Sequence, residues 1–235
     1  MNLVWPARDY LAGYVAALER GWSPDNLRQE AAREELARIA ANAEAFLASL
    51  VDREAAGEPI VFPDGSTVPR LPGYRMWMWD GEFSGSTSLR WQPGQEALPP
   101  HCLGHIGYAV VPWKRRRGYA TLALRQMLEH AKAEGLRHVE VTTRVDNEPS
   151  QRVILANGGV LDEEFSAPAA LGGARHLRYR IQLEGPIIGF RPGGLDVSHA
   201  TCLCRRREPS ARRSCGSPAA IADRTLRDAA GPPEG

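Results

Sequence analysis

The stretch VVPWKRRRGYAT, residues 110–121, decides how the middle of the chain folds. An apolar run ends at Pro112, four cations follow, and Gly118 precedes a segment with apolar residues at helical spacing. A helix N-terminus presents unpaired N–H groups and a partial positive charge, so it binds phosphate readily. Glycine lets the backbone approach a ligand closely. The stretch therefore predicts a phosphate-binding turn between a strand and a helix; the alternative is a solvated basic turn that caps an ordinary helix.

The composition is that of an ordinary globular protein, with 43% hydrophobic and 24% charged residues among 235 and a net charge of +1. This balance gives no global attraction to nucleic acid or to anionic membranes, and we expect neither as a partner. No apolar stretch approaches the roughly 20 residues that span a bilayer, and no basic start precedes an apolar block. We therefore expect a cytoplasmic protein, and the sequence leaves its oligomeric state open.

Three zones differ in composition, and we expect them to be distinct segments of structure. Residues 1–56 have a helical pattern, in which Ser23 resembles an N-cap and no Gly or Pro interrupts residues 25–56. This zone predicts two helices that pack on the core. Residues 57–184 mix strands and helices, and residues 185–235 are rich in Pro, Gly, Ala, Ser and Arg, which predicts disorder.

The central zone predicts a mixed, mostly antiparallel α/β sheet flanked by helices. A turn over residues 63–66 comes first, and Asp80-Gly81 is a strong hairpin signal between two strand patterns. The predicted strands are residues 74–79, 83–91, 104–111, 138–143, 160–165 and 176–183, and the predicted helices are residues 118–133 and 149–156.

The last zone also contains potential metal ligands, namely His199, Cys202, Cys204 and Cys215. Their spacing is not the paired C-x₂-C of a zinc site, and we expect no metal. Five arginines of this zone could hold nucleic acid loosely through its phosphates, but no aromatic residues stand among them to stack on bases.

Three motifs together resemble the GNAT superfamily of N-acetyltransferases over about residues 74–183. Residues 115–120, RRRGYA, match the family's R/Q-x-x-G-x-G/A loop, and residues 110–112, VVP, match its V-x-P strand ending. Downstream, four residues match the spacing of the N-x-x-A/S-x-x-x-Y-x-x-x-G-F segment: Asn147, Ser150, Ile154 and Gly158. The combination is similar to a bacterial subgroup whose substrates are mostly unassigned.

The resemblance implies an acetyl-CoA-dependent N-acetyltransferase and assigns roles to residues. Backbone groups of the loop would hold the diphosphate and the strand edge before it would pair with pantetheine, while Asn147 and Ser150 would contact the pantetheine arm. For Asn147 the alternative is a plain helix cap. The implied cofactor-binding residues are Val110, Val111, Arg115, Arg116, Arg117, Gly118, Tyr119, Ala120, Thr121, Asn147 and Ser150.

The catalytic groups of the family are not all present. The positions of its usual base match Gly104 and Ile106, and the tyrosine that protonates the leaving thiolate matches Ile154. Alternate side chains share a face of a strand, so Tyr108 lies on the face of Ile106 and His105 on the other. Tyr108 and His105 are the candidate catalytic residues; for His105 the alternative is packing under the sheet.

Two functions follow from these observations. The first is transfer of an acetyl group to a primary amine of a small molecule or peptide, which proximity alone would support with solvent as the base. The second is a non-catalytic acyl-CoA-binding module, in which the N-terminal helices form a partner surface.

Overall fold

The computed structural model describes residues 1–25, 28–61 and 65–183. The tail over residues 185–235, with its predicted disorder and its histidine and cysteines, therefore lies outside the described residues, as do the first two residues of the turn over residues 63–66. None of the helices in the described part is long and apolar enough to cross a membrane.

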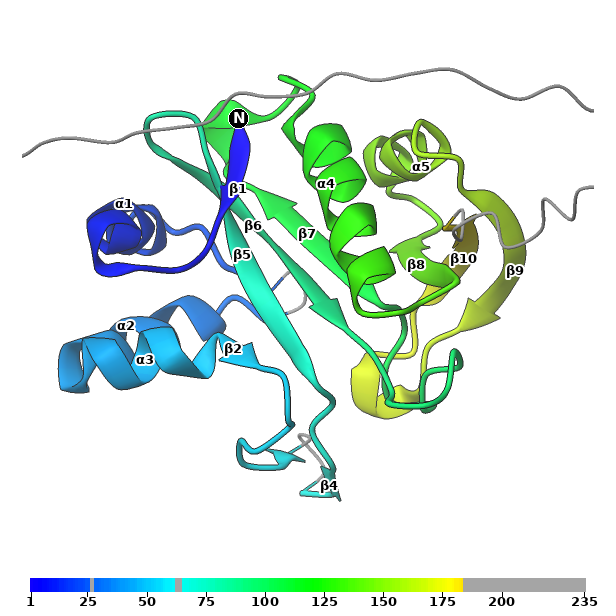
Figure 1. Ribbon diagram of the computed structural model, residues 1–235, viewed down its shortest axis with the longest axis horizontal. Helices are drawn as coiled ribbons and strands as arrows, with labels where there is room; N and C mark the ends of the chain where they lie inside the picture. Colours follow the sequence, from blue (N-terminus) through cyan, green and yellow to red (C-terminus); the bar gives the residue numbers. More distant parts are fainter. Residues whose placement is uncertain (26–27, 62–64, 184–235) are drawn as a thin grey trace, which may run out of the picture. The chain divides into compact units, whose positions relative to one another are not determined.

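Ten strands, five α-helices and two 3-10 helices make up the described part of the chain (Figure 1). The strands are β1 (Asn2–Val4), β2 (Val51–Asp52), β3 (Ile60–Val61), β4 (Thr67–Val68), β5 (Gly73–Trp79), β6 (Phe83–Arg90), β7 (Ile106–Val110), β8 (His138–Arg144), β9 (Val160–Ser166) and β10 (Arg175–Gln182). The α-helices are α1 (Arg8–Glu19), α2 (Ala31–Ala41), α3 (Ala43–Ser49), α4 (Tyr119–Ala133) and α5 (Glu148–Leu155), and the 3-10 helices are η1 (Pro112–Lys114) and η2 (Ala169–Leu171). The predicted mixed, mostly antiparallel α/β fold is confirmed, and each predicted central strand and helix is present.

The strands form two principal sheets that are interrupted between β7 and β8. One sheet has the order β1-β5-β6-β7, with β2 also on β5, and the other has the order β8-β10-β9. At the base of the interruption the His105 N–H donates to the Glu140 carbonyl at 2.8 Å. The Glu140 N–H in turn donates to Nδ1 of the His105 ring at 3.0 Å. Beyond this pair β7 and β8 share no ladder in the described part, so the edge of β7 is left open.

Side chains alternate between two cores, one on each face of the larger sheet. Met76 and Leu89 pack with Leu124 of α4 and Ile154 of α5. The neighbouring Trp77 instead packs with residues of α1 and α3, which cover the opposite face (Figure 1). The helix α4, which follows the basic loop, and the N-terminal helices therefore lie on opposite faces of the sheet.

The N-terminal zone differs from the two helices predicted for it. Ser23 does not cap a helix: its hydroxyl donates to the Arg28 carbonyl at 2.7 Å and accepts the Asp25 N–H at 3.2 Å, so α2 begins later, at Ala31. Asn42 then adopts an extended conformation and its Oδ1 accepts the Ala45 N–H at 3.0 Å. Asparagine is a preferred N-cap, which is why a third helix starts where one continuous helix was expected.

A buried polar cluster attaches α1 and α2 to β5. Tyr14 donates to Glu35, and Nη1 of Arg75 donates to the Tyr14 hydroxyl at 3.1 Å and to Glu35 Oε1 at 2.8 Å. Burial, the largest effect, raises the pKa of Tyr14 far above its ordinary value, so its hydroxyl stays protonated. The division of the chain at residue 56 stays a prediction.

The buried His105, which contacts Glu140 between the two sheets, predicts that the free energy of unfolding depends on pH. Burial, followed by the nearby His138, lowers the pKa of His105 from 6.5 to about 4. The unfolded chain therefore binds a proton that the folded protein does not bind between these values, so the free energy of unfolding falls as the pH drops through this window. From pH 7.5 to pH 5 the loss amounts to about 2 kcal/mol.

The variant His105→Asn keeps an acceptor near the position of Nδ1 but does not titrate. Urea unfolding at the two pH values should show a clearly smaller difference for the variant than for the natural protein. An unchanged difference would mean that other groups produce the pH dependence.

Candidate active site

The basic loop carries a run of backbone N–H groups between β7 and α4. Arg116 has a φ of 63° and Gly118 a φ of 76°, both in the left-handed region. Left-handed residues of this kind turn successive N–H groups toward one point, which makes an anion site. None of the N–H groups of residues 116–121 donates to another described residue. The loop therefore offers several donors, at the positive end of a 15-residue helix, to one bound anion.

Asp80, at the hairpin between β5 and β6, attaches both ends of this loop. Its Oδ1 accepts from Nζ of Lys114 at 2.6 Å, and its Oδ2 accepts from the Tyr119 hydroxyl at 2.6 Å. The buried Lys114 also contacts Ser84 Oγ at 3.3 Å and Glu82 Oε2 at 3.2 Å. Sequence reasoning missed this role, because Asp80-Gly81 was interpreted as a turn and nothing in the sequence brings it to residues 114–119.

This attachment engages two side chains of the basic stretch. Lys114 was counted among the four cations of the cradle, but its charge is compensated by Asp80. The hydroxyl of Tyr119 is likewise committed to Asp80, so only its backbone is available to a cofactor. Burial opposes the charge of Asp80, but hydrogen bonds from Lys114 and Tyr119 outweigh it and hold the pKa of that carboxyl well below its usual range.

The remaining cations of the stretch are exposed. Nε of Arg115 donates to the Val110 carbonyl at 3.4 Å, so this side chain folds back over the end of β7. Within the described chain, Arg116 and Arg117 make no ion pair. Their charges are thus available to phosphate groups at the loop.

Of the two valines assigned to the strand edge, only Val110 has a backbone N–H that points to the open edge of β7. Val111 is buried, its N–H donates to the Ser84 carbonyl at 3.0 Å on the β6 side, and its carbonyl accepts the backbone N–H of Lys114 at 3.0 Å. Assigning Val111 to cofactor binding is therefore corrected. Because backbone groups alternate along a strand, the N–H groups of Val110 and Tyr108 point to the opposite edge, where the sheet is interrupted.

Tyr108, Ser150 and Asn147 come together at the start of α5. The Tyr108 and Ser150 hydroxyl oxygens lie 2.8 Å apart. Oδ1 of Asn147 accepts the Ser150 N–H at 3.2 Å and caps the helix. The cap that was weighed as the alternative role of Asn147 is thus present, and it leaves the Nδ2 group, which donates to no described residue. Burial raises the pKa of Tyr108 to about 12.

His105 does not join this group. Its side chain is fully buried, with 0% exposure, and its Nδ1 is occupied by the Glu140 N–H. The enclosed ring is not accessible to an acetyl acceptor, which corrects the candidate catalytic role of His105. Its role is structural, in the contact with Glu140 at the base of the interruption. Ile154, at the position of the family's tyrosine, is also fully buried in the core, as its apolar side chain requires.

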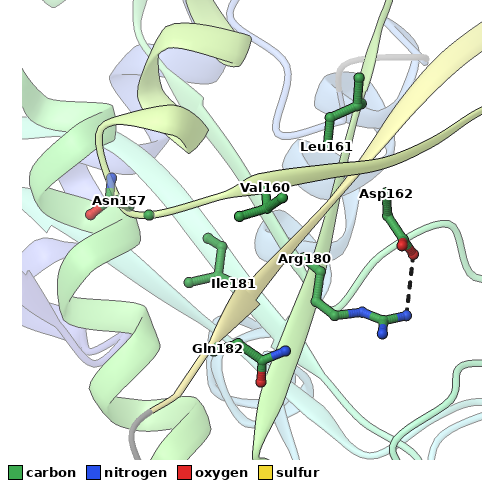
Figure 2. A pocket seen from close by; sticks show the side chains of 8 residues that line it. Asn157, Val160, Leu161, Asp162, Arg180, Ile181 and Gln182 are labelled. Carbon is green, nitrogen blue, oxygen red and sulfur yellow. Dashed lines mark hydrogen bonds and ion pairs between the residues drawn. The ribbon is translucent and has the colours of Figure 1, made fainter.

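A cavity of about 330 Å³ lies elsewhere, between the α5–β9 turn and β10 (Figure 2). Val160 and Leu161 line it and are 69% and 53% exposed, and Arg180 pairs with Asp162 at its rim at 3.1 Å. None of the predicted site residues lines this cavity, so it is not part of the candidate active site.

The chain was compared with protein families, curated proteins and solved structures. The acetyltransferase (GNAT) family matches residues 39–158. No curated protein matches the chain. RimJ of Mycobacterium smegmatis, solved with CoA-disulfide, is 19% identical over 77% of this chain and 80% of its own, with a TM-score of 0.52. The microcin C7 self-immunity acetyltransferase MccE, solved with acetyl-CoA and AMP, is 12% identical over 77% and 91%, with a TM-score of 0.48.

The family match covers half of the chain and includes β7, the basic loop, α4, β8 and α5. The chain belongs to the acetyltransferase (GNAT) family, and it is an acetyltransferase that depends on acetyl-CoA. The likeness to RimJ shows the same fold.

Replacing Asp80 tests whether it orders the loop. In Asp80→Asn, Lys114 loses its main partner, so we expect acetyl-CoA affinity to fall about 10-fold and the free energy of unfolding to fall by about 1–3 kcal/mol. Calorimetric titration and urea unfolding measure the two quantities. The control Glu82→Gln alters a side chain that is 81% exposed, and both quantities should change little. Unchanged affinity in Asp80→Asn would remove Asp80 from the site.

Replacing Gly118 tests whether the N–H groups of residues 116–121 bind the cofactor. Apart from the adjoining residues, no atom of the described residues lies within 4 Å of a Cβ built on Gly118 or on Gly135, and both have a positive φ, of 76° and 87°. Valine at either position should therefore cost a similar 1–2 kcal/mol or so of stability through left-handed strain. Only Gly118→Val should also lower acetyl-CoA affinity, by about 100-fold, because its side chain fills the anion site. Equal affinities of the two variants would make Gly118 a turn residue only.

Proposed function

We propose that the protein transfers the acetyl group of acetyl-CoA to a primary amine of a small molecule or peptide. The observation that carries the proposal is the juxtaposition of unpaired loop N–H groups, over residues 116–121, with the open edge of β7. A diphosphate needs the first and an extended amide-containing arm needs the second, and coenzyme A contains both.

In this proposal the cofactor follows the chain from α4 back along β7. The diphosphate lies on the N–H groups of Arg116–Thr121, with the exposed Arg116 and Arg117 side chains and the Thr121 hydroxyl around it. The pantetheine arm lies along the open edge of β7, which leaves the Val110 N–H to the thioester carbonyl, and Nδ2 of Asn147 donates to one of the carbonyls of the arm. The CoA in the RimJ structure supports this choice of cofactor.

The chemistry needs an unprotonated amine, stabilisation of an oxyanion, and release of a thiolate. The amine nitrogen attacks the thioester carbon, a C–N bond forms, and the carbonyl oxygen becomes an oxyanion that accepts from the Val110 N–H. The C–S bond then breaks and the electron pair leaves on sulfur. The proton lost by the ammonium goes to water, and the thiolate regains one from solvent.

Tyr108 suits hydrogen bonding to the leaving sulfur better than full proton transfer. Its pKa of about 12 exceeds that of a thiol, which is near 8.5, so the phenol keeps its proton while it stabilises the thiolate. The Ser150 hydroxyl, 2.8 Å away, is placed to donate to the phenol oxygen. The phenol itself donates to the Ser150 carbonyl at the longer distance of 3.4 Å, and in this proposal the leaving sulfur replaces that carbonyl as the acceptor. This pair would replace the tyrosine that Ile154 displaces.

The N-terminal helices cover the face of the sheet opposite α4, and we propose that they wall the acceptor side. The non-catalytic binding module remains as the competing account of the same cradle. The two accounts differ in turnover, because a binding module holds acetyl-CoA without releasing its thiol to added amines.

The test is release of free thiol from acetyl-CoA in a screen of amines, with acetyl-CoA binding measured in parallel. We expect amine-dependent thiol release, and for Tyr108→Phe a kcat lower by about 10-fold or more with the KM for acetyl-CoA unchanged. Ser150→Ala should show part of the same loss. Binding without thiol release for any amine would support the non-catalytic module, and an unaltered kcat in Tyr108→Phe would exclude Tyr108 from the chemistry.

A further inference from the structure

We infer that Arg90 binds a carboxylate on the acceptor, so that the substrate is an amine that also carries a carboxylate group. This inference rests on the proposed function and specifies its substrate class. It begins with the charges on the sheet face that the N-terminal helices cover.

Four arginines in the described part of the chain are neither buried nor exposed: Arg75, Arg90, Arg178 and Arg180. Three of them have carboxylate partners. Arg75 pairs with Glu35 at 2.8 Å, Arg178 with Glu163 at 2.7 Å, and Arg180 with Asp162 at 3.1 Å. Arg90 forms no ion pair with any described residue; Nη2 donates only to the Ser88 hydroxyl, at 3.0 Å. A half-buried cation without a counter-charge is costly, which favours binding of an anion there.

The guanidinium of Arg90 lies beside the strand that borders the cleft. Ser88 is the register partner of Gly107 on β7. A Cβ atom on Gly107 would lie 3.3 Å from Nη2 of Arg90 and 3.4 Å from Oγ of Ser88. The absence of a side chain at Gly107 therefore lets the guanidinium reach over β7, one residue before Tyr108.

The two sides of β7 then have different tasks. Tyr108 contacts Ser150 of α5, on the face of the sheet proposed for the leaving sulfur. Arg75, which is the register partner of Ser88 on β5, contacts α1 and α2 on the other face. An amine entering from the side of the N-terminal helices passes Arg90 before it reaches the thioester. With one donor on Ser88, the planar fork of Arg90 retains others for two-point binding of a carboxylate.

The test compares acceptors matched in chain length, glycine, β-alanine and 4-aminobutyrate against their carboxamides. Because the carboxamides have the lower amine pKa, kcat/KM is expressed per concentration of unprotonated amine. We expect kcat/KM for the carboxylates to exceed that for the carboxamides by about 10-fold or more. Arg90→Gln should lower kcat/KM for the carboxylates about 10- to 100-fold and leave that for the carboxamides and the KM for acetyl-CoA nearly unchanged. Arg90→Lys, which keeps the charge without the fork, should give an intermediate value.

The control Lys132→Gln removes a positive charge from the exposed last turn of α4 and should change neither series. Equal losses on both members of each pair in Arg90→Gln, or a natural preference for the carboxamides, would overturn the inference while leaving the proposed function intact. If the protein binds acetyl-CoA but neither the carboxylates nor the carboxamides cause thiol release, both the inference and the proposed function are overturned.

Discussion

The interruption of the sheet between β7 and β8 is the constraint on which the rest of the structure depends. A continuous sheet would satisfy the edge of β7 and leave no room for a thioester. Here the two sheets meet at His105 and Glu140, through one backbone hydrogen bond and one bond to the imidazole. Because the ring nitrogen takes the place of a backbone carbonyl, pairing ends there, and the strands are free to separate above it.

The conformation of the basic loop depends on a second interaction, the contacts of the Asp80 carboxylate. It holds Lys114 before the loop and Tyr119 after it, while the N–H groups of residues 116–118 between them donate to no described residue. Left-handed conformations at Arg116 and Gly118 are strained for ordinary residues, and such strain persists where surrounding contacts fix it. The hairpin tip therefore fixes the conformation of the loop, and the hydrogen bond from Tyr119 to Asp80 attaches the first residue of α4 to the hairpin.

The fold was largely predictable because its signals are local. The Asp80-Gly81 turn, the apolar spacing over residues 118–133 and the family motifs around Gly118 each identify an element from neighbouring residues. The helix break at Asn42 was missed because asparagine tolerates both a helix interior and a cap, and the choice depends on packing. The parts of the site that were missed or misassigned all depend on contacts between distant segments: Asp80 with Lys114, Val111 with Ser84, and His105 with Glu140.

The central claim is that the backbone of Arg116–Thr121 holds the diphosphate of coenzyme A. The most direct measurement is the ¹H–¹⁵N spectrum of the protein, with the loop amides assigned, during titration with desulfo-CoA. The account predicts that these amide protons move downfield together as the ligand saturates, since each gains a phosphate acceptor. Saturable binding that leaves these amides unmoved and shifts another region would contradict it.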